Sequence, residues 1–288
     1  MSLRVKNMLA DERSHAVPGL PPSFKDLFSE NAKNGADAPV TGLFVCSGDA
    51  GTAEICAGAG FDYLLIDGEH SPLSLASIQN QLRTIAAYPT LALVRVPSND
   101  EVLIKQYLDL GAQSLLIPMV DTADDARAAA AAVQYPGAGV RGVGSALARS
   151  ARWNRVPNYL EKARDSISLV LQIESASGVA NVEQILAVEG IDALFIGPSD
   201  LAASMGYLGQ QNHPEVVEAV HGVIASAKAH GKIVGVNAFV HEQAQQYLQA
   251  GADFVNVGAD VALLARASEN LAQSWQHSAE DWLVKNSY

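Results

Sequence analysis

The sequence feature that most constrains the fold is an alternation of strand-like and helix-like segments that repeats eight times along the chain. Short apolar runs rich in Val, Ile and Leu are separated by longer segments whose apolar residues recur at helical spacing. Glycine often stands just before a strand-like run, as it does at the C-terminal ends of helices. We expect strands over residues 42–46, 63–66, 91–94, 114–118, 167–173, 193–196, 233–236 and 254–257, and helices over 52–59, 73–87, 99–110, 124–134, 179–186, 214–230, 242–250 and 261–273.

This alternation predicts an α/β fold in which eight parallel strands close into a (β/α)8 TIM barrel, a fold that typically takes about 250 residues. A doubly wound open sheet is the alternative, but the GxGxxG motif does not follow the first expected strand. We therefore expect a single barrel domain over residues 23–277.

Two tails should flank this domain. Residues 1–22 are polar and interrupted by proline and glycine, and we expect a flexible tail there and a second tail over 278–288. Between the first tail and the first strand, a short amphipathic helix is expected over 23–34. The apolar face of this helix would carry Phe24, Leu27 and Phe28.

Composition restricts the class of protein. The chain has 288 residues, of which 49% are hydrophobic, enough for a large core. A net charge of −12 and the lack of a Lys/Arg cluster argue against nucleic acid as a partner. No apolar run approaches the ~20 residues of a membrane span, and no signal peptide is recognisable. Cys46 and Cys56 do not form a metal-ligand or disulfide pattern, so we expect a cytoplasmic protein.

Two carboxylates follow neighbouring strand-like runs. Glu174 comes after the run 169–173, and Asp200 comes shortly after the run 194–196. They are about one βα repeat apart, so both should lie at the end of the barrel where active sites form. Carboxylates brought together repel each other, and a hard divalent cation such as Mg²⁺ would stabilise them. The alternative is that each carboxylate caps the helix after it, since acidic residues suit helix N-termini.

A histidine and an arginine are expected at the same end of the barrel. The second strand leads to His70, and the third ends at Arg95. With the two carboxylates, these residues suit carbanion chemistry: a metal and a guanidinium stabilise a developing enolate, and an imidazole moves protons near neutral pH. Asp109, at the end of the third helix, could orient His70 and support its charge.

Each of these residues also has a structural alternative. His70 stands before a Ser-Pro pair and could be a turn residue. Arg95 could form an ion pair with Asp67 or Glu69. Asp109 could be a solvated residue, although a carboxylate near a helix C-terminus is unfavourable without a specific partner. The joint placement of these residues on one face favours a functional site.

The connection over residues 135–165 is longer than the others and rich in Gly and Arg. Connections of this length are usually functional or disordered. Its arginines could bind an anionic substrate, or they could pair with carboxylates of a neighbouring subunit. These arginines are Arg141, Arg149, Arg152 and Arg155.

Five longer segments carry a family resemblance: LLIDGEHSP at 64–72, LIKQYLDLGAQSLLIPMVDTADDAR at 103–127, RGVGSALARSARW at 141–153, QIES at 172–175 and IGPSDLAASMGY at 196–207. Together they closely resemble the HpcH/HpaI aldolases. These are metal-dependent (class II) pyruvate aldolases, among them 4-hydroxy-2-oxoheptanedioate and 2-keto-3-deoxy-sugar-acid aldolases. The resemblance extends from about residue 38 to about residue 273, with its motifs in the same order.

The resemblance implies a role for each matching residue. Glu174 and Asp200 match the divalent-metal ligands, His70 matches the general base, and Asp109 matches the acid that raises its basicity. Arg95 matches the residue that holds the pyruvate oxygens and stabilises the enolate. The substrate-binding positions match Gln172, the backbone of Gly197, Pro198 and Ser199, and Asp200.

The resemblance further implies a (β/α)8 barrel that assembles as a trimer or hexamer and exchanges its last helix between neighbours. It implies Mg²⁺, Mn²⁺ or Co²⁺ as cofactor and neither PLP, NAD nor a Schiff-base lysine. In this sequence no lysine stands at an expected strand C-terminus, and Lys232 precedes its strand. Asn237 stands where relatives often carry an aliphatic residue, so a polar side chain there would change how the aldehyde is held. The extension up to about Gly35 is not matched.

We therefore expect reversible aldol cleavage of a 4-hydroxy-2-oxo acid to pyruvate and an aldehyde through a metal-stabilised pyruvate enolate. In cleavage, His70 would take the 4-hydroxyl proton, directly or through a water molecule. The alternatives are a citrate-lyase-β-like lyase acting on acyl-CoA thioesters and a non-catalytic barrel. The first would need a nucleotide-binding surface, and the second would not need the complete set of acidic and basic residues.

Overall fold

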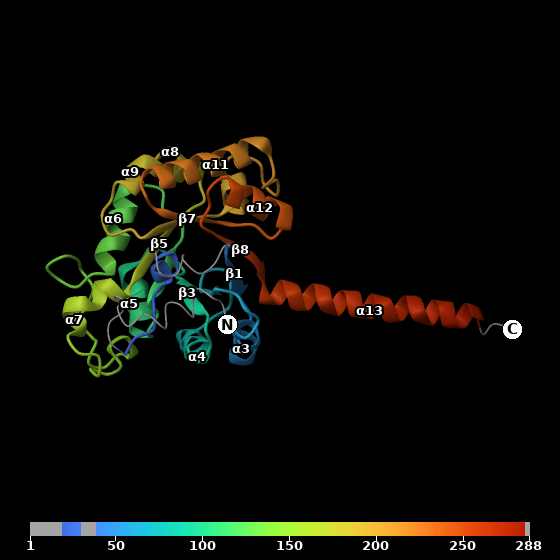
Figure 1. The fold of residues 1–288 in the computed structure, drawn as a ribbon, viewed down its shortest axis with the longest axis horizontal. Coiled ribbons are helices and arrows are strands. Elements are labelled where there is room, and N and C mark those ends of the chain that lie inside the picture. The colour runs from blue at the N-terminus through green and yellow to red at the C-terminus, as the bar shows by residue number, and fades with distance from the viewer. Residues whose placement is uncertain (1–18, 30–38, 286–288) are drawn as a thin grey trace.

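The computed structural model describes residues 19–29 and 39–285. Its eight strands are parallel and pair in sequence order, and β1 pairs with β8, which closes the barrel (Figure 1). The predicted (β/α)8 TIM barrel is confirmed. The strands are β1 (Val40–Val45), β2 (Tyr63–Asp67), β3 (Leu91–Arg95), β4 (Ser114–Ile117), β5 (Ser168–Ile173), β6 (Ala193–Ile196), β7 (Ile233–Asn237) and β8 (Phe254–Ala259).

Helices connect the strands and cover the outside of the barrel (Figure 1). Most begin and end close to the expected residues. The helix expected over 179–186 is two short helices, because Asn181 leaves helical geometry and its side chain donates to the Asp121 carbonyl. The helices are α3 (Ala50–Ala57), α4 (Leu75–Ile85), α5 (Glu101–Asp109), α6 (Ala123–Ala132), α7 (Tyr159–Lys162), α8 (Ala176–Ala180), α9 (Val182–Leu186), α10 (Pro198–Ser204), α11 (Pro214–Ala229), α12 (His241–Gln249) and α13 (Asp260–Lys285), with 3-10 helices η1 (Phe24–Phe28), η2 (Arg149–Ala151) and η3 (Ala163–Ser166).

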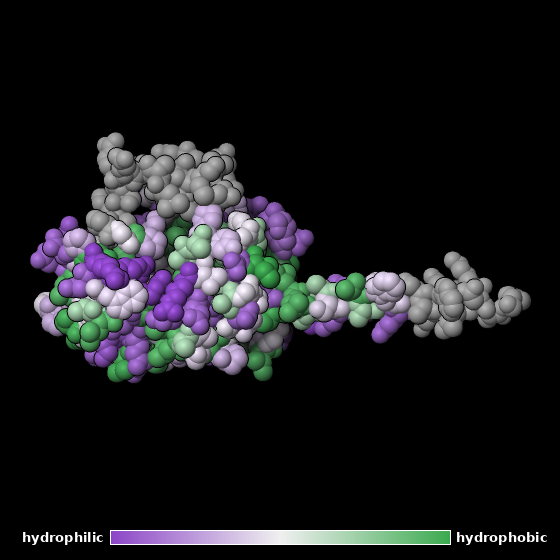
Figure 2. Space-filling model, turned by 90° about the horizontal axis from the view of Figure 1, so that it is seen from below, coloured by the Kyte–Doolittle hydropathy of each residue, from purple (hydrophilic) through white to green (hydrophobic). Residues whose placement is uncertain are grey.

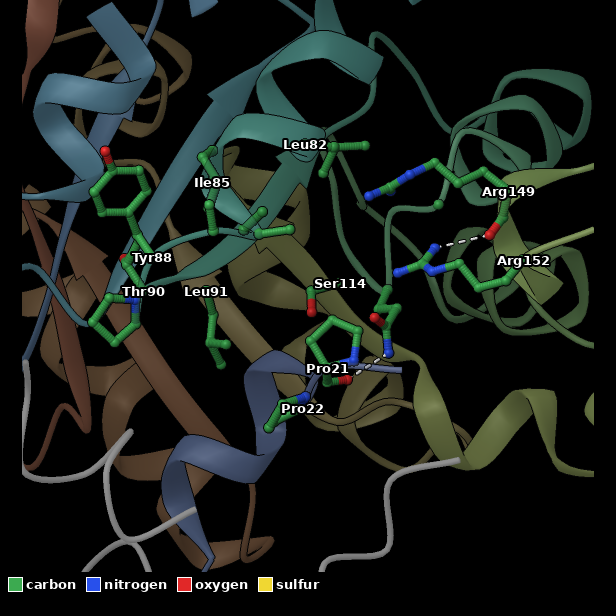
Figure 3. Close-up of a pocket in the computed structure, with 16 residues that line it drawn as sticks. Pro21, Pro22, Leu82, Ile85, Tyr88, Thr90, Leu91, Ser114, Arg149 and Arg152 are labelled. Carbon is green, nitrogen blue, oxygen red and sulfur yellow. Dashed lines mark hydrogen bonds between the residues drawn. The ribbon is translucent and has the colours of Figure 1, made fainter. Parts of the chain in front are cut away.

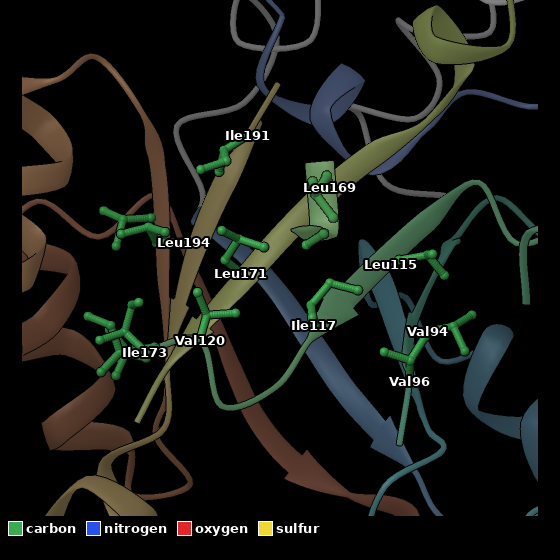
Figure 4. Close-up of a cluster of buried hydrophobic side chains, with 14 of the residues drawn as sticks. Val94, Val96, Leu115, Ile117, Val120, Leu169, Leu171, Ile173, Ile191 and Leu194 are labelled. Atoms are coloured by element: carbon green, nitrogen blue, oxygen red, sulfur yellow. The ribbon is translucent and has the colours of Figure 1, made fainter. Parts of the chain in front are cut away.

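Successive residues of each strand face opposite sides of the barrel wall. In β5, Leu169, Leu171 and Ile173 belong to the apolar layer between strands and helices (Figure 4). Val170 belongs to the cluster inside the barrel, and Gln172 has the same inward parity. The period-two pattern therefore sends polar side chains near the strand ends into the barrel mouth rather than into the helical layer.

The 3-10 helix η1 closes the N-terminal end of the barrel. Phe24 is fully buried, with its ring centroid 5.0 Å from that of Tyr63 and 4.9 Å from that of Phe254. Its backbone N–H donates to the hydroxyl of Ser114, the first residue of β4, at 2.9 Å. The apolar face predicted for this segment is therefore the floor of the barrel.

The expected helix over 23–34 is shorter than predicted. It ends at Phe28 because Ser29 has extended backbone angles, and residues 30–34 lie outside the described part of the chain. Of the expected tail, residues 1–18 also lie outside it. Leu20 is buried in a small cluster with Tyr159 from the long connection.

Two glycines make room for aromatic rings inside the barrel. A Cβ at Gly42 in β1 would lie 2.0 Å from the ring of Tyr63, and a Cβ at Gly235 in β7 would lie 2.3 Å from the ring of Phe254. Neither distance is compatible with a side chain. Glycine at these positions lets the two rings fill the interior above η1.

The C-terminal helix α13 projects away from the barrel (Figure 1). It continues to Lys285, so residues 278–285, expected to form a tail, are helical. Figure 2 shows hydrophobic residues along the described side chains of this helix. None of the described helices is both long and apolar enough to cross a membrane. The exposed apolar residues of α13 include Val261, Leu263, Leu264, Leu271 and Trp275.

Candidate active site

A cavity of about 210 Å³ opens among the C-terminal ends of the barrel strands. This is the end at which TIM-barrel enzymes carry their active sites. The cavity brings together side chains that lie in or just after β1, β2, β3, β5, β6, β7 and β8. Of the residues singled out in the sequence, it is lined by His70, Arg95, Gln172, Gly197, Ser199, Asp200 and Asn237.

Arg95, the last residue of β3, is the buried cation of the site. Its Nε donates to Asp67 Oδ1 at 2.9 Å, and its Nη1 lies 3.0 Å from Glu69 Oε2. Burial disfavours the charged guanidinium, but the hydrogen bond and charge of Asp67 outweigh burial and raise the pKa of Arg95. The ion pair considered as a structural alternative is present, and it fixes a guanidinium that also lines the cavity.

Glu174 follows β5 and is buried, with 3% of its surface exposed. Its Oε1 accepts from the Met119 backbone N–H at 2.8 Å, and its Oε2 accepts from the amide of Gln172. Burial raises the pKa of Glu174 to about 7, and the nearby negative charges of Glu69 and Asp200 act in the same direction. The Met119 N–H and the charge of Arg95 oppose this shift only in part.

Neither Glu174 nor Asp200 caps the helix that follows it, although the structural alternative assumes this. Ser175, not Glu174, caps α8 by accepting from the Gly178 N–H, and Gly197 occupies the N-cap position of α10. In the described part of the chain, the carboxylate of Asp200 makes neither a hydrogen bond nor an ion pair. The Asp200 carboxylate, which lines the cavity, thus remains free of protein partners in this part of the chain, whereas both oxygens of Glu174 already accept hydrogen bonds.

Gly197 allows these groups to approach each other. A Cβ at this position would lie 2.8 Å from Glu174 Oε2 and 3.0 Å from Gln172 Nε2. Pro198 then begins α10, which carries Ser199 and Asp200 in its first turn. A proline suits this first helical position because its missing N–H has no helical partner there.

The donor set of the site consists of two carboxylates and an amide. Among the described residues, no cluster of three or more His, Cys, Asp or Glu side chains has the arrangement of a metal site. Two carboxylates are a number that a hard divalent cation such as Mg²⁺ accepts when water and substrate oxygens complete its coordination. A buried Oε1 of Gln172 without a hydrogen-bond partner adds a further oxygen.

His70 lies at the rim of the cavity, with its side chain 65% exposed. Asp67 Oδ1 accepts from the backbone N–H groups of Glu69 and His70, at 3.1 and 3.3 Å, and this holds the turn. The Nε2 of His70 is 3.8 Å from Glu69 Oε2. The imidazole is thus reachable by a substrate and has a carboxylate nearby, so it is suited to proton transfer.

Several lining residues were not identified from the sequence. Phe44 and Phe239 form an edge-to-face pair at the cavity, with centroids 6.4 Å apart, and Phe44 also lies under the Arg95 guanidinium at 5.2 Å. Cys46 follows β1 and also lines the cavity; burial raises the pKa of its thiol to about 11. The position after a strand end is a usable signal for Cys46, whereas no local pattern marks an aromatic ring as a lining residue.

Three predicted site residues do not line the cavity: Glu174 and Pro198 are close to lining residues in the chain, whereas Asp109 lies far from it. Asp109 ends α5, which runs back from the mouth of the barrel, so it lies at the opposite end from His70. Its Oδ1 is 3.4 Å from Nη2 of the fully buried Arg141. The expectation of a specific partner for Asp109 is confirmed, but within one chain this partner is Arg141 and not His70.

The arginines of the long connection lie at this same far end. The connection leads from α6 into the start of β5, so it passes the N-terminal ends of the strands. Arg141 stacks over Tyr135 at 4.6 Å, and Arg149 and Arg152 line a second cavity. Arg141, Arg149 and Arg152 therefore lie away from the candidate active site of their own chain.

Comparisons with known proteins agree with this geometry. The family model described as HpcH/HpaI aldolase/citrate lyase matches residues 40–267. A protein of Salmonella heidelberg (strain SL476) named 4-hydroxy-2-oxo-heptane-1,7-dioate aldolase is 50% identical over 248 residues, 86% of this chain and 94% of the relative. An Escherichia coli (strain ATCC 8739) protein of the same name is 51% identical over 237 residues, 82% of this chain and 90% of the relative.

A solved structure shares both fold and sequence. The crystal structure of an HpcH/HpaI aldolase/citrate lyase family protein from Burkholderia cenocepacia J2315 matches with a TM-score of 0.82 and 39% identity. The match covers 88% of this chain and 98% of that one. The family model, the half-identical relatives and this structure all span the barrel and the cavity at its mouth. The chain belongs to the HpcH/HpaI aldolase/citrate lyase family.

Proposed function

We propose that this protein is a divalent-metal-dependent aldolase that reversibly cleaves a 4-hydroxy-2-oxo acid into pyruvate and an aldehyde. The observation that carries the proposal is the buried carboxylate of Glu174, close to Asp200 and with no cation bonded to it in the described residues. Relatives of about half-identical sequence are named 4-hydroxy-2-oxo-heptane-1,7-dioate aldolase, which supports this class of substrate.

Glu174 and Asp200 would hold the metal, for which Mg²⁺, Mn²⁺ and Co²⁺ are the candidates. A bound divalent cation supplies Lewis-acid polarisation of a 2-oxo acid. The raised pKa of Glu174 supports this assignment, because burial beside Asp200 and Glu69 leaves the site short of positive charge. Gln172 would orient Glu174 through the hydrogen bond that it donates to it.

Arg95 would hold the carboxylate and keto oxygens of the substrate. Its guanidinium faces the cavity while Asp67 and Glu69 fix its orientation, so it needs no rearrangement as negative charge develops on the keto oxygen. The remaining pyruvate contacts would come from the backbone of Gly197, Pro198 and Ser199, next to the two carboxylates.

His70 would act as the general base. In the cleavage direction, its imidazole takes the 4-hydroxyl proton, the C4–O bond becomes the aldehyde carbonyl, and the C3–C4 bond breaks. The electron pair of that bond moves toward the keto oxygen, where Arg95 stabilises the charge. A proton then returns to C3 to give pyruvate. In the synthetic direction, the same base removes a proton from the pyruvate methyl group.

The aldehyde half would lie toward Asn237 and the pair Phe44–Phe239. Asn237 Oδ1 is buried without a hydrogen-bond partner in the described residues, and the side chain lines the cavity. An amide oxygen without a hydrogen-bond partner favours an aldehyde that carries a hydrogen-bond donor, such as a hydroxyl group. We infer that Asn237 recognises the acceptor portion of the substrate.

We further infer that the protein assembles as a homo-oligomer, either a trimer or a hexamer. Its projecting helix α13 exposes Leu264 and Trp275, which are 67% and 72% exposed in the single chain. A long helix with large apolar residues in water favours burial against another copy.

The experiment that tests the function follows the methyl signal of pyruvate by proton NMR in D₂O, before and after Mg²⁺ or Mn²⁺ is added to metal-stripped protein. We expect metal-dependent exchange of the methyl protons, which does not require the aldehyde to be known. Glu174→Gln should lose the stimulation by metal, and Arg95→Ala should lose most exchange while its circular dichroism spectrum is retained. If no added metal produced exchange of the methyl protons, the proposal that the protein is a pyruvate aldolase would be refuted.

A further inference from the structure

We propose that a second pocket, at the end of the barrel opposite the candidate active site, binds a small organic carboxylate. The carboxylate group would lie against Arg149 and Arg152, and the apolar body would lie along the wall formed by the end of α4 and the start of β3 (Figure 3).

The pocket is a cavity of about 340 Å³, within the range of small-molecule sites. Leu91 and Ser114, which line it, are the first residues of β3 and β4. The catalytic candidates stand at the other ends of the strands, so the pocket is separate from the active site. Gln113 connects two of its walls by donating to the Pro21 carbonyl at 2.9 Å.

The two arginines are held in place by backbone groups rather than by acids. Arg149 Nη1 donates to the Leu110 carbonyl at 3.4 Å, and Arg152 Nη1 donates to the Arg149 carbonyl at 2.8 Å. A Cβ at Gly111, whose φ is +97°, would lie 2.4 Å from Arg149 Nη1, so glycine makes room for the guanidinium. Neither arginine forms an ion pair with a carboxylate in the described part of the chain.

The electrostatics of the pocket favour an anion. Burial lowers the pKa of Arg149 to about 10, and the charges of Arg152 and Arg83 act in the same direction. Burial also lowers the pKa of Arg152, opposed only by Tyr159. Two half-buried cations without a counter-ion are unfavourable, and a carboxylate accepts hydrogen bonds in the planar geometry that guanidinium groups offer.

The opposite side of the pocket is apolar and defines the rest of the ligand. Figure 3 shows the arginines reaching in from one side, with Ile85, Tyr88 and Leu91 on the other. A bare inorganic anion would leave this surface unused. An aromatic or medium-chain aliphatic carboxylate would engage the cationic and the apolar side together.

Calorimetric titration of the full-length chain with benzoate and with hexanoate tests the proposal. We expect saturable binding that weakens at least tenfold in Arg149→Gln and in Arg152→Gln. Arg127→Gln is the matched control, because it removes the same charge from an exposed residue of α6 that does not line the pocket. Arg95→Ala tests whether the carboxylates bind at the active site instead; binding should persist in this variant.

Four results would overturn the proposal. They are absence of saturable binding, equal loss in Arg127→Gln, loss in Arg95→Ala with retention in Arg149→Gln, and binding of inorganic phosphate as tight as that of benzoate. Light scattering on the same samples tests whether the arginines bind a second copy of the chain instead. If Arg149→Gln and Arg152→Gln lower the mass of the assembly, the arginines hold a second copy of the chain and not a small carboxylate.

Discussion

At the scale of single residues, the site depends on how Glu174 and Arg95 are buried. Each is almost completely enclosed, yet their charges are balanced differently. Arg95 has two acidic neighbours, Asp67 and Glu69, which keep it charged. Glu174 has hydrogen-bond donors but lies among other acids, so its charged form is unfavourable until a cation is present. This imbalance gives a pH dependence that can be measured.

The free energy of unfolding of the metal-free protein should fall as the pH rises from about 5 to about 7.5. Because burial raises the pKa of Glu174 to about 7 in the folded state, above its ordinary value of 4.5, the folded chain holds this proton more tightly than the unfolded chain. Ionisation then costs up to about 3 kcal/mol. Urea unfolding of wild type and Glu174→Gln in EDTA checks this: the variant should gain stability relative to wild type between pH 5 and pH 8.

Glu218→Gln, an exposed glutamate of α11, is the matched control and should show no such pH-dependent difference. Addition of Mg²⁺ or Mn²⁺ at pH 8 should remove the deficit of the wild type, because a bound cation favours the ionised carboxylate. A difference between wild type and Glu174→Gln that does not change with pH would contradict the electrostatic account of this residue.

Asn237→Leu should change the choice of aldehyde more than the handling of pyruvate. The substitution removes a buried amide oxygen that has no hydrogen-bond partner among the described residues, and it leaves Arg95 and Glu174 intact. We expect kcat/KM to fall roughly tenfold or more for hydroxylated aldehydes and much less for unsubstituted ones. Pyruvate methyl exchange is the internal control and should stay near wild type; a uniform loss with all aldehydes would argue against a role in selection.

At the scale of the elements, η1 closes one end of the barrel, and the C-terminal ends of the strands form the candidate active site at the other. The 3-10 helix closes the floor through Phe24, while the inward parity of β5 sends Gln172 to the mouth. The strands were readable from the sequence as short, nearly continuous apolar runs, and the side to which each residue points follows from the alternation of side chains along a strand. The length of η1 was not readable, since its end at Ser29 follows from backbone angles that no periodicity encodes.

Phe24→Ala should destabilise the barrel by about 3–5 kcal/mol, the usual cost of removing a buried aromatic side chain. Phe24 is fully buried against Tyr63 and Phe254, so the cavity left behind lies at the centre of the floor. Phe239→Ala makes the same truncation at a ring that is 48% exposed and should cost much less. Chemical unfolding of both variants decides; similar losses would mean that η1 does not support the barrel.

At the scale of the whole molecule, the two ends of the barrel carry different chemistry. The mouth holds the acidic and basic residues to which we assign substrate binding and catalysis, and the far end holds Asp109, Arg141, Arg149 and Arg152. The role that family resemblance gives to Asp109, support of His70, requires contact between the two side chains. Since a single chain separates them, we expect that contact only between two copies.

Subunit mixing tests this expectation. His70→Ala and Asp109→Asn should each lose most activity when prepared alone. If Asp109 of one copy supports His70 of another, refolding the two variants together should restore about a quarter of the wild-type activity, the share of sites that random mixing leaves intact in a symmetric assembly. Activity that stays absent in the mixture would show that Asp109 acts within its own chain, through Arg141.

The sequence by itself determined the barrel and most of the residues at its mouth. Eight apolar runs separated by helical segments leave few other folds, and the residues that follow them, such as His70 and Asp200, must gather at one end. Local periodicity encodes both facts, so neither required coordinates.

Only the tertiary structure decided which side chains meet. In the structure Arg95 forms ion pairs with Asp67 and Glu69, and Asp109 forms one with Arg141. Phe24 packs against Tyr63 at the closed end of the barrel. These contacts join segments that are distant along the chain, and their geometry is set by barrel closure and by how far each helix extends. No local pattern of apolar and polar residues carries that information.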